Sequence, residues 1–213
     1  MIISRGRRYI FVHAPKTGGT SLALALEARA MADDILIGDT PKARRRRGRL
    51  HGLPARGRLW KHATLADIEG AVAPDDPARD LVVTLVRDPW ARAVSYYHWL
   101  RSQRFDHPAV GLARDLDFAD FLSHPQTLAS FGAETYGSYV AGSDGREHPA
   151  LFVRLEHLTA DLRPFEAHLG FRLEVPHANA GTHPPYRDCY TPRSAELIGR
   201  IKAEDIRRFG YVF

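Results

Sequence analysis

The residues around positions 80–89 place the strongest constraint on the fold. The stretch DLVVTLVRDP is a continuous apolar run that ends in charged residues and a proline. A strand covered on both faces carries such a run, because neither face meets water. We therefore predict a central strand of a parallel sheet, followed by a helix, PWARAVSYYHWLR, that begins at Pro89.

Other parts of the chain alternate strand and helix patterns in the same way. Tyr9 to Ala14 and Ala150 to Leu155 have the pattern of buried strands, and Thr20 to Met31 is a run of strong helix formers. Near the end, Thr191 can cap a helix whose first residue is Pro192. The alternation predicts an α/β fold of three layers, with a central parallel β-sheet flanked by helices.

Composition indicates one globular domain. The 213 residues are 44% hydrophobic, which suffices for one core, so we predict a single domain over 1–213. No apolar run approaches the roughly 20 residues of a membrane helix, and residues 1–8 lead into the first strand without a signal peptide. We therefore expect no transmembrane segment and a cytoplasmic location. Cys189 is the single cysteine, so it forms no internal disulfide.

The net charge of +5 is concentrated in one segment. Residues 42–58, KARRRRGRLHGLPARGR, hold eight of the 30 Lys and Arg residues and no acidic residue. We expect a basic loop here, either solvated and partly mobile or a landing surface for an anionic acceptor such as an acidic glycan, a nucleic acid or a membrane. No aromatic residue interrupts the run, which argues against nucleic acid.

The stretch FVHAPKTGGTS has the pattern of an anion-binding loop between a strand and a helix. Gly18 and Gly19 allow a tight turn, the amides at Thr20 and Ser21 would point at an anion, and Lys16 adds a full charge. An ATP-type loop places its lysine after the last glycine, whereas here Lys16 precedes both glycines. The order favours an anion that is bound without magnesium.

The sequence contains few residues with the spacing of metal ligands. Asp88 is the nearest substitute for a magnesium-binding aspartate, but Arg87 beside it would compete for its charge. No histidine pair has metal-ligand spacing, and Cys189 has no partner cysteine. We therefore expect no metal.

The loop PKTGGTS resembles the 5′-phosphosulfate loop of sulfotransferases that use 3′-phosphoadenosine 5′-phosphosulfate (PAPS). In that family a strand ending in arginine and a serine about two helical turns later bind the 3′-phosphate, and Arg87 and Ser95 match this second signature. The resemblance implies that Lys16 stabilises the transferred group electrostatically and that residues 16–21 hold the donor, whose product is 3′-phosphoadenosine 5′-phosphate (PAP). The cofactor-binding residues it implies are Lys16, Thr17, Gly18, Gly19, Thr20, Ser21, Arg87 and Ser95.

The end of the chain resembles the tail of the Golgi-type carbohydrate sulfotransferases and their bacterial relatives. That tail closes with an aspartate–phenylalanine–glycine–tyrosine pattern, here Asp205, Phe209, Gly210 and Tyr211. In the family the loop before the last helix covers the nucleotide. By this resemblance Thr182, Tyr186 and Arg187 become further candidates for cofactor binding.

Sulfuryl transfer needs a general base for the acceptor hydroxyl. The segment WKHATLADIEG is similar to the paired-histidine segment of hexuronic acid 2-O-sulfotransferases, with His62 matching the second histidine and Trp60 standing in place of the first. We predict His62 as the base, with His51, Glu27 and Glu156 as alternatives. Those enzymes also have a basic residue where His13 stands, which argues against a uronic acid substrate.

Three functions therefore follow from the sequence. The first is a PAPS-dependent sulfotransferase that acts on a hydroxyl of a carbohydrate acceptor, on a glycan or a glycolipid, with a small metabolite as the alternative acceptor. The second is a P-loop kinase of a small molecule, and the third is a non-catalytic protein that binds anions or nucleic acid through residues 42–58. The sequence does not fix the oligomeric state.

Overall fold

The computed structural model describes residues 1–72, 79–178 and 184–213. The chain divides into two compact units, Met1–Val86 with Tyr136–Asn179, and Arg87–Thr135 with Ala180–Phe213. The single domain stays a prediction, because the compactness of each unit does not measure whether the two fold together.

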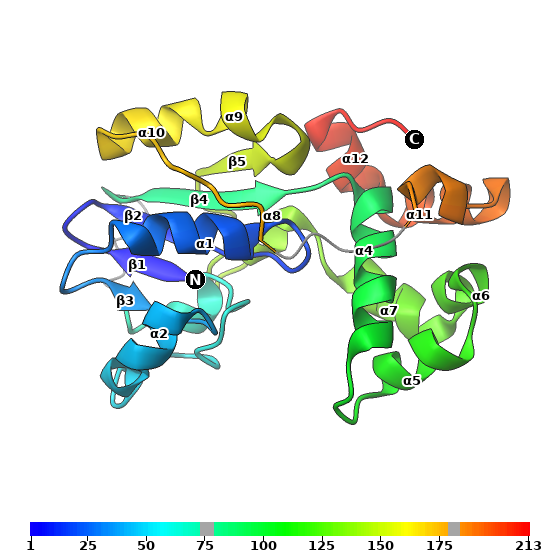
Figure 1. Ribbon diagram of the computed structural model, residues 1–213, viewed down its shortest axis with the longest axis horizontal. Coiled ribbons are helices and arrows are strands. Elements are labelled where there is room, and N and C mark those ends of the chain that lie inside the picture. The colour runs from blue at the N-terminus through cyan, green and yellow to red at the C-terminus, as the bar shows by residue number, and fades with distance from the viewer. Residues whose placement is uncertain (73–78, 179–183) are drawn as a thin grey trace. The chain divides into compact units, whose positions relative to one another are not determined.

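The first unit holds the sheet and the helices around it (Figure 1). Its elements are β1 (Ile2–Ser4), β2 (Tyr9–Val12), α1 (Gly19–Ala28), β3 (Ile35–Leu36), α2 (Pro41–Arg46), the 3₁₀ helices η1 (Arg47–Leu50) and η2 (Ala66–Ile68), β4 (Leu81–Val86), α8 (Tyr136–Tyr139), β5 (Ala150–Arg154), η3 (Leu155–His157), α9 (Leu158–Asp161) and α10 (Arg163–Leu169).

In the described residues of the second unit, the regular elements are all helices (Figure 1). Its elements are α4 (Pro89–Ser102), α5 (Pro108–Asp115), α6 (Phe118–Ser123), α7 (Pro125–Ala133), η4 (Tyr186–Cys189), α11 (Pro192–Ile201) and α12 (Ala203–Phe209).

The sheet of the first unit has the strand order β3-β1-β2-β4-β5. β2 pairs parallel with β4, and β4 pairs parallel with β5, with Thr84 opposite both Val12 and Phe152. The predicted α/β fold with a largely parallel central sheet is confirmed. β1 is an exception that the sequence did not reveal, because it runs antiparallel to both β2 and β3.

The strands β2 and β4 are buried on both faces, as the apolar runs predicted. On one face Tyr9 and Phe11 pack with Leu22 and Leu26 of α1 and with Phe165 of α10. The residues that alternate with them, such as Ile10 and Val82, are equally inaccessible at 0% exposure. Because neither face meets water, the carboxyl ends of these strands are the part of the sheet where polar loops can form.

In the second unit α4 contributes the central residues of the hydrophobic core. Trp90, Ala93, Tyr97 and Leu100 recur at helical spacing and pack with residues of α5, α6 and α11. Tyr97 is 3% exposed, so it belongs to the core of this unit and not to an exposed aromatic surface.

The helix starts follow capping chemistry. The Thr191 hydroxyl oxygen accepts a hydrogen bond from the Ser194 amide, and the Ser194 hydroxyl oxygen accepts one from the Thr191 amide. This capping box confirms the predicted start of α11. Predicted ends shift by a few residues: the strand from Tyr9 stops at Val12, and α1 spans Gly19–Ala28.

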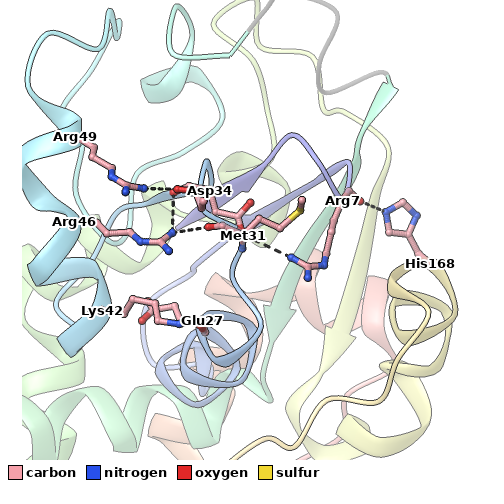
Figure 2. A network of polar contacts seen from close by, with 9 residues as sticks. Arg7, Glu27, Met31, Asp34, Lys42, Arg46, Arg49 and His168 are labelled. Atoms are coloured by element: carbon pink, nitrogen blue, oxygen red, sulfur yellow. Dashed lines mark hydrogen bonds and ion pairs between the residues drawn. The ribbon is translucent and has the colours of Figure 1, made fainter.

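Residues 42–58 are not a loop over their whole length. α2 and η1 occupy their first part, because Thr40 accepts a hydrogen bond from the Ala43 amide and Pro41 stands at the first helical position. Lys42, Arg46 and Arg49 then donate to backbone carbonyls at the end of α1 and in the turn after it (Figure 2). These three cations stabilise the structure, so the prediction of a solvated loop is wrong for this part.

Within the ranges that the structure describes, no helix combines the length and the apolar character that crossing a membrane requires.

Candidate functional site

The loop from β2 to α1 is built from backbone in the left-handed region. Gly18 has φ 83°, and Lys16 has φ 65°, which is uncommon for a residue with a Cβ. The buried Thr17 hydroxyl donates to the Ala14 carbonyl at 2.8 Å and closes the turn. Strain of this kind persists where the surroundings fix it, and it is concentrated at ligand sites.

The glycines of this loop are required by close neighbours. A Cβ on Gly19 would lie 2.1 Å from the His13 ring, and one on Gly18 would lie 2.8 Å from Leu155 in η3. The loop after β2 therefore packs against η3, which follows β5, at the carboxyl edge of the sheet.

The first turn of α1 is suited to an anion. In the described structure no side chain caps α1 at Gly18, and the first turn contains no acidic residue. Amides without a capping side chain, at the positive end of the helix dipole, favour an anionic group. The hydroxyl of Ser21 is engaged differently, because it accepts from the Ala178 amide at 3.1 Å and donates to the Ala178 carbonyl at 3.3 Å.

His62 lies directly against this loop. Its Nδ1 is 2.8 Å from the His13 carbonyl oxygen, and the two imidazole rings meet edge to face at 4.7 Å. A carbonyl only accepts, so Nδ1 carries the hydrogen, and in the neutral ring Nε2 keeps its lone pair. This tautomer is the one that a general base needs.

His13 is the neutral partner in this pair. It is 6% exposed, and burial holds its pKa well below the usual range. The position that carries a basic residue in hexuronic acid 2-O-sulfotransferases therefore carries no charge here.

The alternative bases lie in different surroundings. Glu27 is 4% exposed, and its carboxylate accepts the Thr40 hydroxyl at 2.5 and 2.7 Å, so it supports the start of α2. His51 is exposed, next to η1. Glu156 is exposed in η3, one residue after the leucine that packs on Gly18.

The second predicted signature lies at the start of α4, in the second unit. Arg87 precedes the helix and Ser95 lies within it, both half-buried. Between them Asp88 caps α4: its Oδ1 accepts from the amides of Trp90 at 2.8 Å and Ala91 at 3.2 Å. Sequence reasoning assigned Asp88 to competition between Arg87 and a metal and missed this cap, although an aspartate before a proline is a signal for it.

The segment before α11 is attached to the same helix start. The Tyr186 hydroxyl donates to Asp88 Oδ2 at 2.8 Å, and burial, followed by this bond, raises the pKa of Tyr186. The exposed Arg187 guanidinium lies over the rings of Tyr186 and Phe213 at 5.5 and 5.3 Å. Two of the three predicted covering residues thus lie in η4, while Thr182 is outside the described residues.

Neighbours of His62 add features that the sequence did not predict. Trp60 is 42% exposed and meets the His62 ring edge to face at 5.1 Å, and Arg58 lies over the Trp60 ring at 5.7 Å. Over residues 1–72, 79–178 and 184–213 no group of three or more His, Cys, Asp or Glu side chains is arranged to hold a metal ion.

Comparison with known proteins finds similar solved structures. No protein-family model matches the chain, and neither does any curated protein. The crystal structure of mouse sulfotransferase SULT7A1 complexed with PAP matches it with a TM-score of 0.56 and 18% sequence identity, over 96% of this chain and 86% of that chain. At this identity the match shows the fold alone. The fold of this chain is thus that of a sulfotransferase.

Proposed function

We propose that the chain is a PAPS-dependent sulfotransferase that transfers a sulfuryl group to a hydroxyl of an acceptor. The observation that carries the proposal is the loop after β2, with Lys16 and Gly18 in the left-handed region and an uncapped helix start behind them. Gly19 lets the His13 ring approach the backbone of this loop, because a Cβ there would lie 2.1 Å from the ring, and that contact supports the fixed shape of the loop. The fold shared with a sulfotransferase solved with PAP supports the same assignment.

The donor would be held by two sets of groups. The amides of residues 17–20 and the Lys16 ammonium would bind the 5′-phosphosulfate, while the Ser21 amide donates to the Gly18 carbonyl at 3.0 Å. Lys16 would also stabilise the charge that grows on the leaving phosphate oxygen. Arg87 and Ser95 would bind the 3′-phosphate as charged and neutral donors. Tyr186, Arg187 and Thr182 would cover the nucleotide.

When bound, PAPS supplies an electrophilic sulfur and a phosphate leaving group. His62 would accept the acceptor's hydroxyl proton at Nε2, since Nδ1 donates to the His13 carbonyl. The acceptor oxygen would form its bond to sulfur as the bond from sulfur to the 5′-phosphate oxygen breaks, in line with the attack. The products would be PAP and a sulfate ester. The sulfuryl group carries little charge, so we propose transfer without a metal ion.

The Asp88 contacts favour this reading over a kinase. A magnesium-dependent kinase needs a carboxylate that is available to the metal. Asp88 is 6% exposed, and its two oxygens accept three hydrogen bonds from Trp90, Ala91 and Tyr186.

The acceptor is proposed to be a carbohydrate, on a glycan or a glycolipid. That step rests on the resemblance of the chain's end to carbohydrate sulfotransferases. The cytoplasmic location stays a prediction of the sequence.

Calorimetry tests the proposed function. We expect PAP to bind in the presence of EDTA and ATP to bind weakly with or without magnesium. A clear preference for Mg-ATP over PAP would refute the sulfotransferase and support a kinase. An acceptor screen with isotope-labelled PAPS, read by mass spectrometry, then identifies the product.

A further inference from the structure

The six cations of residues 42–49 fall into two sets, of which one donates hydrogen bonds to backbone carbonyls. Lys42 donates to the Glu27 carbonyl, Arg46 to the Met31 carbonyl at 2.8 Å, and Arg49 to the Ala32 carbonyl (Figure 2). Their spacing places them on one face of the α2–η1 segment, against the end of α1. This set already has a structural role, because it satisfies a carbonyl in the last turn of α1 and carbonyls in the segment that follows the helix.

The other set faces solvent. Arg44, Arg45 and Arg47 are exposed, and no acidic residue occurs between 42 and 58. Lys61 forms an ion pair with Asp39 at 2.8 Å. A hydrogen bond from Lys61 lowers the pKa of the Asp39 carboxyl, and the charges of Arg44 and Arg47 lower it further. Asp39 directly precedes Thr40, the N-cap of α2, so its ion pair with Lys61 places Lys61 beside the start of the helix that contains Arg44.

Lys61 directly precedes His62, the proposed general base, in the chain. Its neighbours in sequence are Trp60 and His62, whose rings touch at 5.1 Å, and Arg58 lies over the Trp60 ring. An exposed indole thus lies beside His62, with cations on both sides of it along the chain. Asp39 is paired with Lys61, and the Asp67 carboxylate lies close to Gly57, next to Arg58 in the chain.

We propose that Arg44, Arg47, Arg58 and Trp60 form the acceptor-binding surface and that the acceptor is an anionic sugar chain. Its carboxylate or sulfate groups lie on sugars next to the one that reacts, since His13 argues against a uronic acid at the reacting position. The inference rests on the proposed function, because His62 is the base toward which this surface would deliver a hydroxyl. The arginines bind the acidic groups, and the indole offers an apolar face for a sugar ring. A single exposed aromatic does not provide the succession of stacking rings that single-stranded nucleic acid uses.

Binding of defined oligosaccharides tests the surface. The probes are a heparin-derived oligosaccharide for sulfate, an oligogalacturonate for carboxylate and a malto-oligosaccharide of equal length as the neutral control. Single-stranded DNA and vesicles of anionic lipid complete the set, all at one ionic strength with PAP present.

The variant is Arg44→Glu with Arg47→Glu. Its matched control is Arg146→Glu with Arg163→Glu, which reverses the same charge at two exposed positions of the same unit. We expect the first pair to weaken binding of an acidic oligosaccharide by at least about tenfold, and the control pair by less than about twofold. Trp60→Ala should weaken binding of the same oligosaccharide without changing its dependence on salt.

The PAP affinity of every variant is measured in parallel. This measurement distinguishes failure of the proposed acceptor-binding surface from failure of the proposed sulfotransferase function. Unchanged oligosaccharide binding in the first pair would overturn the surface while leaving the sulfotransferase intact. Equal affinity for the neutral oligosaccharide, or tighter binding of DNA or vesicles, would overturn the acceptor class. Loss of PAP binding by the unaltered protein would instead refute the proposed function.

Discussion

The helices that follow the parallel strands β2 and β4 differ in how the backbone amides of their first turn are capped. After β2 the backbone turns through left-handed conformations at Lys16 and Gly18, and in the described structure no side chain caps α1. After β4 the Asp88 carboxylate occupies the amides of Trp90 and Ala91. The first helix start can accept an external anion through its amides, whereas the second has satisfied its amides internally.

This difference explains why two phosphates would need different ligands. At α1 the backbone can bind the anion and Lys16 adds charge. At α4 an anion has to be bound by side chains, which is the role proposed for Arg87 and Ser95. The four predictions below test the division, from the largest effect to the smallest.

His62→Ala should lower the rate of transfer by about 10²- to 10⁴-fold, because the variant lacks the proton acceptor. PAP affinity should stay unchanged, since His62 contacts the loop through the His13 carbonyl and not through the loop's amides. Transfer rates and calorimetry measure the two effects. His51→Ala, at an exposed histidine, is the control. An equal loss of transfer rate in both variants would mean that His62 is not the general base.

Gly19→Ala should destabilise the protein by about 3 kcal/mol, because the added methyl group would lie 2.1 Å from the His13 ring. Gly132→Ala in α7 is the matched control, since nothing lies within 4 Å of a Cβ there. That control should stabilise the protein by roughly 0.5–1 kcal/mol through helix propensity. Urea denaturation reports both values, and equal stability of the two variants would show that the loop tolerates side chains.

Asp88→Ala should cost about 2 kcal/mol, because the variant leaves the Trp90 and Ala91 amides without their cap. Tyr186→Phe should cost about 1 kcal/mol through loss of one hydrogen bond to the carboxylate. The same denaturation assay separates them. If Asp88→Ala cost no more than Tyr186→Phe, the cap at α4 would not distinguish the two helix starts.

Stability should fall with pH below about 6.5, the ordinary pKa of histidine, because buried His13 stays neutral while the unfolded chain binds the proton. The unfolded state binds more protons in this range, so the contribution of His13 to stability is complete above this pH and declines by at most about 1.4 kcal/mol per pH unit below it. Denaturation midpoints from pH 8 to pH 5, compared with those of His13→Gln, give the contribution. An identical slope in the variant would mean that His13 is not its source.

Much of the fold was predictable because local chemistry decides it. The apolar run of β4 and the Thr191–Pro192 start of α11 each contain their own signal, and the structure confirms both. β1 escaped prediction because three residues are too few to show a period. The prediction of a loop over residues 42–58 was partly wrong because it rested on their charge. The signal for the helix α2 is Thr40 before Pro41, which lies outside these residues.

The candidate site was predictable only in parts. The lysine, the glycines and Arg87 stand in recognisable order along the chain. The contacts of His62 with His13, and of Tyr186 with Asp88, join residues 49 and 98 positions apart. Such pairs depend on tertiary packing, and no local pattern encodes them.

The central claim is that Lys16 and Arg87 bind opposite ends of one nucleotide. Calorimetry of Lys16→Ala and Arg87→Ala with PAP and with adenosine 5′-monophosphate, which lacks the 3′-phosphate, tests it most directly. We predict that Arg87→Ala weakens PAP about 10- to 100-fold and leaves the monophosphate unchanged, while Lys16→Ala weakens both by a similar factor. Unchanged PAP affinity in Arg87→Ala, or an equal loss for the monophosphate, would contradict the account.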